Sequence, residues 1–263
     1  TRCDHAYVHD NLTGRWWLAG DGDALPCVED LRTRAATQLN DGETRGGAAF
    51  DGPLRSNMGR DAYERAVARA VEYIRAGDVF QVNLAHVFSG RMRGSPRELF
   101  AALTRSAGPW YGALLETPWG VIASQSPELF LDYDARTRQV TTRPMKGTRA
   151  GGTAGEGLRG AAELLASRKD AAELNMIVDL MRNDLGRVCE YGSVCVENAR
   201  EVEAHGGASG KGSGGGVLQG VATVSGVVRE EEGLGGLLRA AFPPGSITGA
   251  PKVRAMQIIN ELE

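Results

Sequence analysis

The sequence predicts a protein of mixed helices and sheets: an α/β fold of the α+β kind, built as a layered sandwich of antiparallel sheets flanked by helices. Five stretches have the residue pattern of strands and four have that of helices. A chain of 263 residues, 42% of them hydrophobic, can also bury a full core. We expect strands at 78–89, 119–133, 138–143, 190–203 and 217–228, and helices at 60–76, 96–106, 155–185 and 250–262.

Composition divides the chain into an irregular N-terminal segment, 1–59, and one main domain, 60–263. Glycine is the outlier, with 36 residues, and part of this excess forms the run GGASGKGSGGG at 206–216. Such a low-complexity run has no side chains with which to pack a core. We therefore expect a flexible surface insertion between two neighbouring strands.

The first predicted helix, 60–76, is amphipathic. Tyr63, Val67 and Ala70 recur at helical spacing, and Gly77 is a typical C-terminal stop. The same periodicity argument defines the other helices, so each is expected to bury one face.

The predicted strand that follows is mostly apolar on both faces. Gln81 and Asn83 are therefore expected to be buried and to need hydrogen-bond partners, as a pair of core amides would. His86 is expected to be a core histidine with one hydrogen bond and no catalytic role.

Two strands joined near Ser126 and Pro127 precede a third that is expected to end at Pro144. Glu128 and Lys146 lie 18 positions apart along this stretch. A hairpin return over that distance can bring a carboxylate and an amine into one pocket.

The long helix predicted at 155–185 carries Glu173 and Asp184 on the same stripe as the apolar Ile177. A buried carboxylate on such a stripe is costly without a cation or a donor. An arginine partner, a position at the rim or a divalent metal could each explain Glu173. Arg182 lies on the opposite side of the helix and is a poor partner.

The last predicted helix begins after a glycine-rich stretch, with Thr248 and Gly249 as its cap region and Pro251 in its first turn. Gly245, Gly249 and Lys252 superficially resemble a phosphate loop, but Pro251 breaks that pattern and excludes nucleotide binding of this type. Two readings stay open: a plain capped helix, or a helix N-terminus whose N–H groups and lysine bind a carboxylate.

Composition excludes several other classes of function. No apolar run approaches the roughly 20 residues of a membrane span, and a net charge of −3 without a basic run gives no reason to expect nucleic acid. The cysteines lack metal-binding spacing, so reduced thiols are expected. These cysteines are Cys3, Cys27, Cys189 and Cys195.

Five motifs in fixed order resemble those of the chorismate-utilising enzymes, which include anthranilate synthase component I. The motifs are GDVFQVNLAH (77–86), SQSPELFL (124–131), TRPMKGTR (142–149), AELNMIVDLMRNDLGRV (172–188) and FPPGSITGAPKVRAMQIINELE (242–263). The residue at position 146 helps to distinguish between members of this family. Anthranilate synthases usually carry a small residue there, whereas a lysine resembles component I of aminodeoxychorismate synthase, the aminating enzyme of 4-aminobenzoate and folate synthesis.

The resemblance implies roles for individual residues in the conversion of chorismate and ammonia to 4-amino-4-deoxychorismate. Lys146 would be the nucleophile that forms a covalent intermediate, and Glu128 the general acid and base. Glu173 would be one ligand of Mg²⁺. Gln81 would favour ammonia over water, because relatives that use water tend to carry lysine there.

Further residues match substrate-binding positions of the family, and together they imply a chorismate-binding catalytic domain. One departs from the pattern: Gln219 stands where the family commonly has histidine, and His205 is not expected to replace it. The family's chains also continue past the final helix, so the resemblance implies a C-terminally truncated domain. The substrate-binding residues are Gln81, Thr148, Gln219, Gly245, Thr248, Gly249, Ala250 and Lys252.

Ammonia would come from a glutamine amidotransferase, a separate subunit or a fused domain, because its signature does not occur in this sequence. Bacterial cytoplasm or the plastid stroma of an alga or plant would suit such an enzyme. Two alternatives stay open: anthranilate synthase component I with Lys146 as a bystander, and a non-catalytic chorismate-binding fragment, which Gln219 and the chain end favour.

Overall fold

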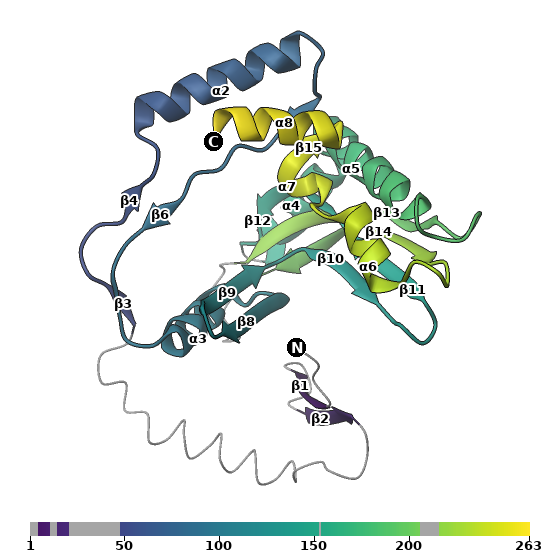
Figure 1. Cartoon of the computed structure of the whole chain (residues 1–263), viewed down its shortest axis with the longest axis horizontal. Coiled ribbons are helices and arrows are strands. Elements are labelled where there is room, and N and C mark those ends of the chain that lie inside the picture. Colours follow the sequence, from purple (N-terminus) through teal and green to yellow (C-terminus); the bar gives the residue numbers. More distant parts are fainter. Residues whose placement is uncertain (1–4, 11–14, 21–47, 153, 206–215) are drawn as a thin grey trace. The chain divides into compact units, whose positions relative to one another are not determined.

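The computed structural model describes residues 5–10, 15–20, 48–152, 154–205 and 216–263 (Figure 1). The chain separates into two compact units, Thr1–Gly47 and Ala48–Glu263. Within the first, β1 (His5–Asp10) pairs with β2 (Arg15–Gly20) in an antiparallel hairpin. The expectation of an irregular segment at the N-terminus missed this hairpin.

The second unit is organised around one antiparallel sheet, as predicted. Its central strand β14 pairs on one edge with β13 and on the other with β11 and then β12, while β10 lies outside β11 (Figure 1). The strands are β10 (Leu129–Tyr133), β11 (Gln139–Arg143), β12 (Met145–Ala150), β13 (Cys195–His205) and β14 (Val217–Val227).

The strand expected to end at Pro144 is confirmed as β11, which ends at Arg143, and a further strand that was not predicted, β12, begins directly after the proline. Proline lacks an N–H, but its carbonyl still accepts a hydrogen bond from Ala222 at 3.0 Å. Pairing with β14 resumes at Met145, opposite Val221. Lys146 is therefore part of the sheet.

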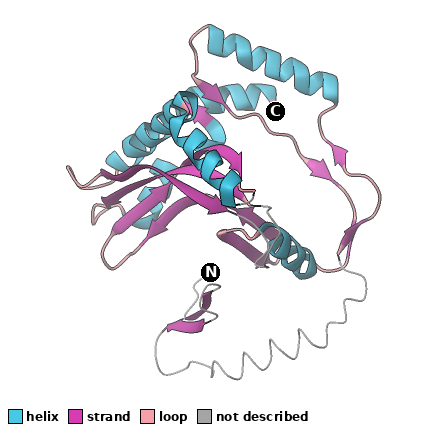
Figure 2. Cartoon of the chain, turned by 180° about the vertical axis from the view of Figure 1, so that it is seen from behind, coloured by secondary structure: helices cyan, strands magenta, loops and turns pink. Residues whose placement is uncertain are grey.

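Helices α5 (Arg168–Gly186) and α6 (Gly233–Ala241) cover one face of this sheet (Figure 2). Because side chains alternate along a strand, Ala222 and Val224 of β14 both reach that face, where they are fully buried. Leu174 of α5 is fully buried in the same cluster.

The long helix predicted at 155–185 is two helices, α4 (Ala154–Ala166) and α5, which meet at Ser167. The Ser167 hydroxyl accepts a hydrogen bond from the N–H of Asp170 at 3.2 Å, so it caps α5. Arg200 donates to the carbonyl of Leu165 at 3.2 Å and satisfies the end of α4.

The strand predicted at 78–89 was wrong. Only β5 (Gln81–Val82) and β6 (Phe88–Ser89) are extended and paired. Phe80 is 77% exposed and Asn83 is also exposed, whereas both of the amides had been expected in the core. The segment lies outside the main sheet. Its apolar side chains are therefore not covered on both faces, as they would be in a central strand.

The first predicted helix is confirmed as α2 (Arg60–Arg75), which packs beside α8 (Lys252–Leu262) (Figure 1). Tyr73 of α2 packs against buried Val79 and Ile258, the latter from α8, and its hydroxyl donates to Glu261 at 2.8 Å. His86 is half-buried beside Tyr63 and bonds to Ser56 at 3.1 Å, so it lies outside the core.

Other elements are shorter, and several were not predicted. The helix expected at 96–106 is confirmed as α3 (Pro96–Ala107), which begins with a capping box between Ser95 and Glu98. The strand predicted at 190–203 starts later, at Cys195. The remaining elements are β3 (Ala49–Phe50), β4 (Arg55–Ser56), β7 (Met92–Arg93), α3 (Pro96–Ala107), β8 (Tyr111–Thr117), β9 (Gly120–Ser126), α7 (Gly245–Thr248) and β15 (Gly249–Ala250).

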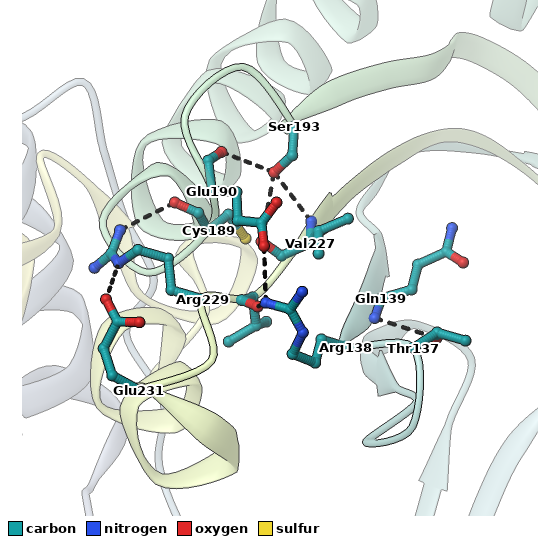
Figure 3. Close-up of polar contacts among 10 residues, drawn as sticks. Thr137, Arg138, Gln139, Cys189, Glu190, Ser193, Val227, Arg229 and Glu231 are labelled. Carbon is teal, nitrogen blue, oxygen red and sulfur yellow. Dashed lines mark hydrogen bonds and ion pairs between the residues drawn. The ribbon is translucent and has the colours of Figure 1, made fainter.

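Polar contacts hold the end of the sheet to the end of α5 (Figure 3). Arg138 donates to Glu190 at 2.8 Å, and Arg229 donates to the carbonyl of Cys189 at 3.0 Å. Ser193 accepts from the N–H of Val227 at 3.1 Å. These bonds satisfy backbone groups where the helix meets the sheet.

Cys189 and Cys195 are both free thiols, as predicted, and burial raises the pKa of Cys189 to about 11. Cys3 and Cys27 lie outside the described residues, as does the glycine-rich insertion apart from Gly216. The strands on either side of that insertion do pair, with His205 opposite Val217. No helix in the described ranges is long and apolar enough to cross a membrane.

Leu174→Ala should destabilise the fold by about 2–5 kcal/mol, because it leaves a cavity at a fully buried position between helix and sheet. Urea unfolding would measure the loss. Leu158→Ala is the matched control: Leu158 is 75% exposed on α4, so its truncation should change the free energy of unfolding by less than about 0.5 kcal/mol. Equal losses in both variants would contradict the proposed core.

Candidate active site

Glu128 lies between β9 and β10 at a mostly apolar cavity of about 220 Å³. Burial raises the pKa of this carboxyl above its ordinary value, although hydrogen bonds from Ser246 and the N–H of Met145 and the nearby charge of Lys146 act in the opposite direction. The cavity is lined by Ser126, Glu128, Leu129, Phe130, Thr142, Pro144, Met181, Phe242, Pro244, Ser246 and Ile247.

The hairpin of β10 and β11 brings Lys146 to this carboxyl, as the spacing of 18 residues had suggested. Leu129 pairs with Arg143, so the chain returns beside Glu128 immediately before β12 begins. Lys146 itself is half-buried opposite Gly220 of β14. An acid and an amine from distant sequence positions therefore share one end of the sheet.

Gln219 lies in the middle of the same sheet, with Thr148 opposite it on one edge and Glu203 opposite it on the other. The Gln219 side-chain oxygen is buried and has no hydrogen-bond partner among the described residues. Thr148 is exposed. The pairing thus unites two of the predicted substrate residues, although Thr148 and Gln219 are 71 positions apart.

Sequence reasoning missed a partly buried charge cluster beside Gln219. Arg143 of β11 pairs with Glu201 at 2.7 Å and also with Glu203, which lies 3.2 Å from His205. Burial lowers the pKa of His205, and Glu203 opposes this shift. His205 is two positions along β13 from the partner of Gln219, so it does not occupy the position of the missing histidine.

The glycine-rich loop brings another group of predicted residues together. Gly249 and Ala250 form β15 and pair with Val82 and Gln81 of β5. At Gly249, φ is 140°, and a Cβ atom there would overlap the Gln81 carbonyl, so only glycine fits. Thr248 is buried and its hydroxyl donates to the carbonyl of Pro244 at 2.9 Å.

Gly245 opens α7 and is buried, one position before Ser246. Ser246 contacts Glu128, so α7 links the loop to the acid. Of this loop, Pro244, Ser246 and Ile247 line the cavity, whereas Lys146, Thr148 and Gln219 belong to the sheet.

Glu173, the predicted metal ligand, is half-buried on α5, with its side chain 38% exposed and 3.6 Å from Lys169. The described residues contain no cluster of three or more His, Cys, Asp or Glu side chains that could hold a metal. Mg²⁺ is often bound by one or two carboxylates together with water. Glu173 fits as one such ligand, but these residues do not complete a site.

Lys252 already has a carboxylate partner within the chain. Its ammonium contacts Asp184, which is 2% exposed, and donates to the carbonyl of Ala241 at 3.0 Å. Of the two acids on the α5 stripe, Asp184 is therefore the deeply buried one, and a lysine 68 positions away is its cation.

Comparison with known proteins identifies the family but not the reaction. The family described as chorismate binding enzyme matches residues 1–263. The chain is 42% identical over 210 residues to aminodeoxychorismate synthase component 1 of Escherichia coli K12, covering 80% of this chain and 44% of that protein. It is 41% identical over 224 residues to anthranilate synthase component 1 of Thermus thermophilus, covering 84% of this chain and 45% of that protein.

A solved structure supports the fold. Anthranilate synthase component I from Streptococcus pneumoniae TIGR4 superposes with a TM-score of 0.71 at 28% identity, covering 98% of this chain and 56% of that one. The chain spans about half the length of the curated relatives it matches. With the family match over its whole length, the chain belongs to the chorismate binding enzymes.

Proposed function

We propose that the protein acts as component I of aminodeoxychorismate synthase and converts chorismate and ammonia to 4-amino-4-deoxychorismate. One observation carries the proposal: Glu128 lines the cavity, where burial raises the pKa of its carboxyl, and Lys146 is close enough for its charge to act on that carboxyl. An amine next to a carboxylic acid supplies both a nucleophile and a proton donor.

In the first step, the neutral amine of Lys146 attacks C2 of chorismate, the double bonds of the ring shift, and the bond from C4 to its hydroxyl breaks. Glu128 in its protonated form gives its proton to that hydroxyl, which leaves as water. In the second step, ammonia adds at C4, the double bonds shift back, and the bond between C2 and the lysine breaks. Glu128 accepts a proton from the added amine and is ready for another cycle.

The environment of Glu128 supports its role as the acid. A carboxyl with an ordinary pKa near 4 is almost wholly ionised at neutral pH and holds no proton to give. Burial shifts Glu128 in the direction that a general acid requires. Its contact with Ser246 and the N–H of Met145 would fix the orientation of the carboxylate after the proton has left.

Gln81 supports ammonia as the incoming nucleophile in this proposal. It is half-buried and is held opposite Ala250 by the short ladder of β5 and β15. Its amide can donate and accept hydrogen bonds but carries no charge, so it would not protonate ammonia. The ammonia would be delivered by a glutamine amidotransferase, as a subunit or a fused domain.

Mg²⁺ belongs to the proposal as the cation that would bind the ring carboxylate of chorismate. Glu173 would supply one carboxylate ligand, from the partly exposed position that it has on α5. A bound Mg²⁺ would offset negative charge on the substrate.

Anthranilate synthase component I is the second candidate, because a relative with that name is nearly as similar as the aminodeoxychorismate synthase. A non-catalytic chorismate-binding protein is the third. Gln219 favours it, because a side-chain amide does not transfer protons as a histidine does.

Product analysis with chorismate, Mg²⁺ and ammonium separates the three candidates. The proposal expects 4-amino-4-deoxychorismate, which becomes 4-aminobenzoate only after a lyase is added. Fluorescent anthranilate formed with release of pyruvate would assign the second candidate. Chorismate binding in calorimetry without turnover would assign the third.

Lys146→Ala should abolish ammonia-dependent turnover in the whole protein but change chorismate affinity by less than about tenfold, because the amine acts mainly in the transition state. Mass spectrometry of the unaltered protein with chorismate and no ammonia should show an adduct on the peptide that contains Lys146. Full activity of the variant without an adduct on the unaltered protein would reject the covalent mechanism.

Glu128→Gln should stabilise the folded protein at pH 7, and this gain should shrink as the pH falls towards 4. The raised pKa means that the folded state holds the Glu128 proton more tightly than the unfolded state, so stability is lost as the pH rises through that pKa. Glutamine does not ionise, so the variant does not lose this stability as the pH rises. Urea midpoints of both proteins at pH 7 and pH 4 measure it, and a larger gain at pH 4 would contradict the burial argument.

A further inference from the structure

The loop between α6 and α8, residues 242–251, connects two parts of the candidate site. Ser246 of this loop contacts Glu128, and Ala250 lies opposite Gln81. Both contacts are made by a short segment with little regular structure of its own. Whatever fixes the two ends of this segment therefore fixes both contacts.

A single ammonium joins the two ends. Lys252, the first residue of α8, donates to the carbonyl of Ala241 at 3.0 Å, and Ala241 is the last residue of α6. The same ammonium contacts Asp184 of α5. Lys252 thus closes the base of the loop and attaches it to the helix that packs on the sheet.

Asp184 has a second cation. Arg187 lies 3.6 Å from Asp184 and donates to the carbonyl of Ala240, next to the carbonyl that Lys252 uses. Two cations at the C-terminus of α6 also interact favourably with the helix dipole. Lys252 and Arg187 therefore together hold the Asp184 carboxylate and the last two carbonyls of α6.

The burial of Lys252 and Asp184 decides whether the lysine is available to bind a substrate carboxylate. The side chain of Lys252 is 12% exposed and that of Asp184 is 3% exposed. A buried ion pair that loses one partner leaves an uncompensated charge. A substrate carboxylate that recruited Lys252 would leave the buried Asp184 with Arg187 alone, 3.6 Å away, so the internal pair is the more stable arrangement.

We propose that Asp184 and Lys252 are positioning residues: their ion pair closes the loop 242–251 and so holds Ser246 against Glu128 and Ala250 against Gln81. The inference rests on the proposed function and gives Lys252 a role other than the substrate contact that its sequence context suggested. Neither residue would touch chorismate.

The test compares Lys252→Met with wild type in steady-state kinetics with chorismate and ammonium. A positioning role predicts that kcat falls about 10- to 100-fold while KM for chorismate changes less than about threefold, because loop geometry matters most in the transition state. The alkaline limb of the pH profile, along which Glu128 loses the proton that it donates, should move as well, since Ser246 no longer holds Glu128. Arg254→Met on the same helix is the matched control, because the side chain of Arg254 is 36% exposed and pairs with Asp78; its kinetics should stay within about twofold of wild type.

A rise in KM of more than tenfold with kcat unchanged would overturn the proposal and make Lys252 a substrate contact. The pair itself is tested by urea unfolding of Asp184→Asn, Lys252→Met and the double variant, which needs no catalysis. The double variant should unfold at a higher urea concentration than either single variant. Additive losses would reject the ion pair, whereas a wild type that makes no 4-amino-4-deoxychorismate would reject the proposed function alone.

Discussion

The pairing of β14 with strands on both of its edges is the constraint on which the rest of the structure depends. It sets Lys146 opposite Gly220 and Thr148 opposite Gln219, so the register of one strand positions the candidate nucleophile. A Cβ atom at position 220 would lie only 2.8 Å from the Lys146 carbonyl oxygen. The backbone can approach this closely because position 220 is glycine. The face of β14 that carries Ala222 and Val224 is covered by α5 and α6, which leaves β14 without freedom to slip.

The fold could be predicted from the sequence in those segments whose residue pattern fits only one kind of secondary structure. The helix α2 has an apolar stripe and a glycine stop, and β14 alternates between two buried faces. The prediction failed where tertiary contacts override such patterns. The segment 78–89 alternates like a strand, but only Val79 is buried, and only β5 and β6 within it pair as strands. Pro144 does end β11, as local rules predict, but those rules gave no sign of β12, which follows at once because the Pro144 carbonyl keeps the ladder with β14 continuous.

The candidate site follows the same division. The proximity of Glu128 and Lys146 could be predicted from the sequence, because a hairpin is a local structure and 18 residues suffice for the chain to return. The contact of Ser246 with Glu128 joins elements more than a hundred residues apart, so nothing in the local pattern predicts it. The stripe on α5 did indicate a buried carboxylate in need of a cation. Which carboxylate it is, Asp184, depends on the arrival of Lys252 from a distant helix.

The proposed chemistry needs an acid that holds its proton and an amine that has lost one, side by side. In water an isolated carboxylic acid and amine would exchange that proton and become an ion pair. A mostly apolar cavity works against ionisation, because removing charges from water is expensive and mutual attraction repays it only with good geometry. The raised pKa of Glu128 is the part of this balance that the structure displays. The loop that carries Ser246 then acts on the acid alone, so its attachment through Asp184 and Lys252 can influence proton transfer without contact with the amine or the substrate.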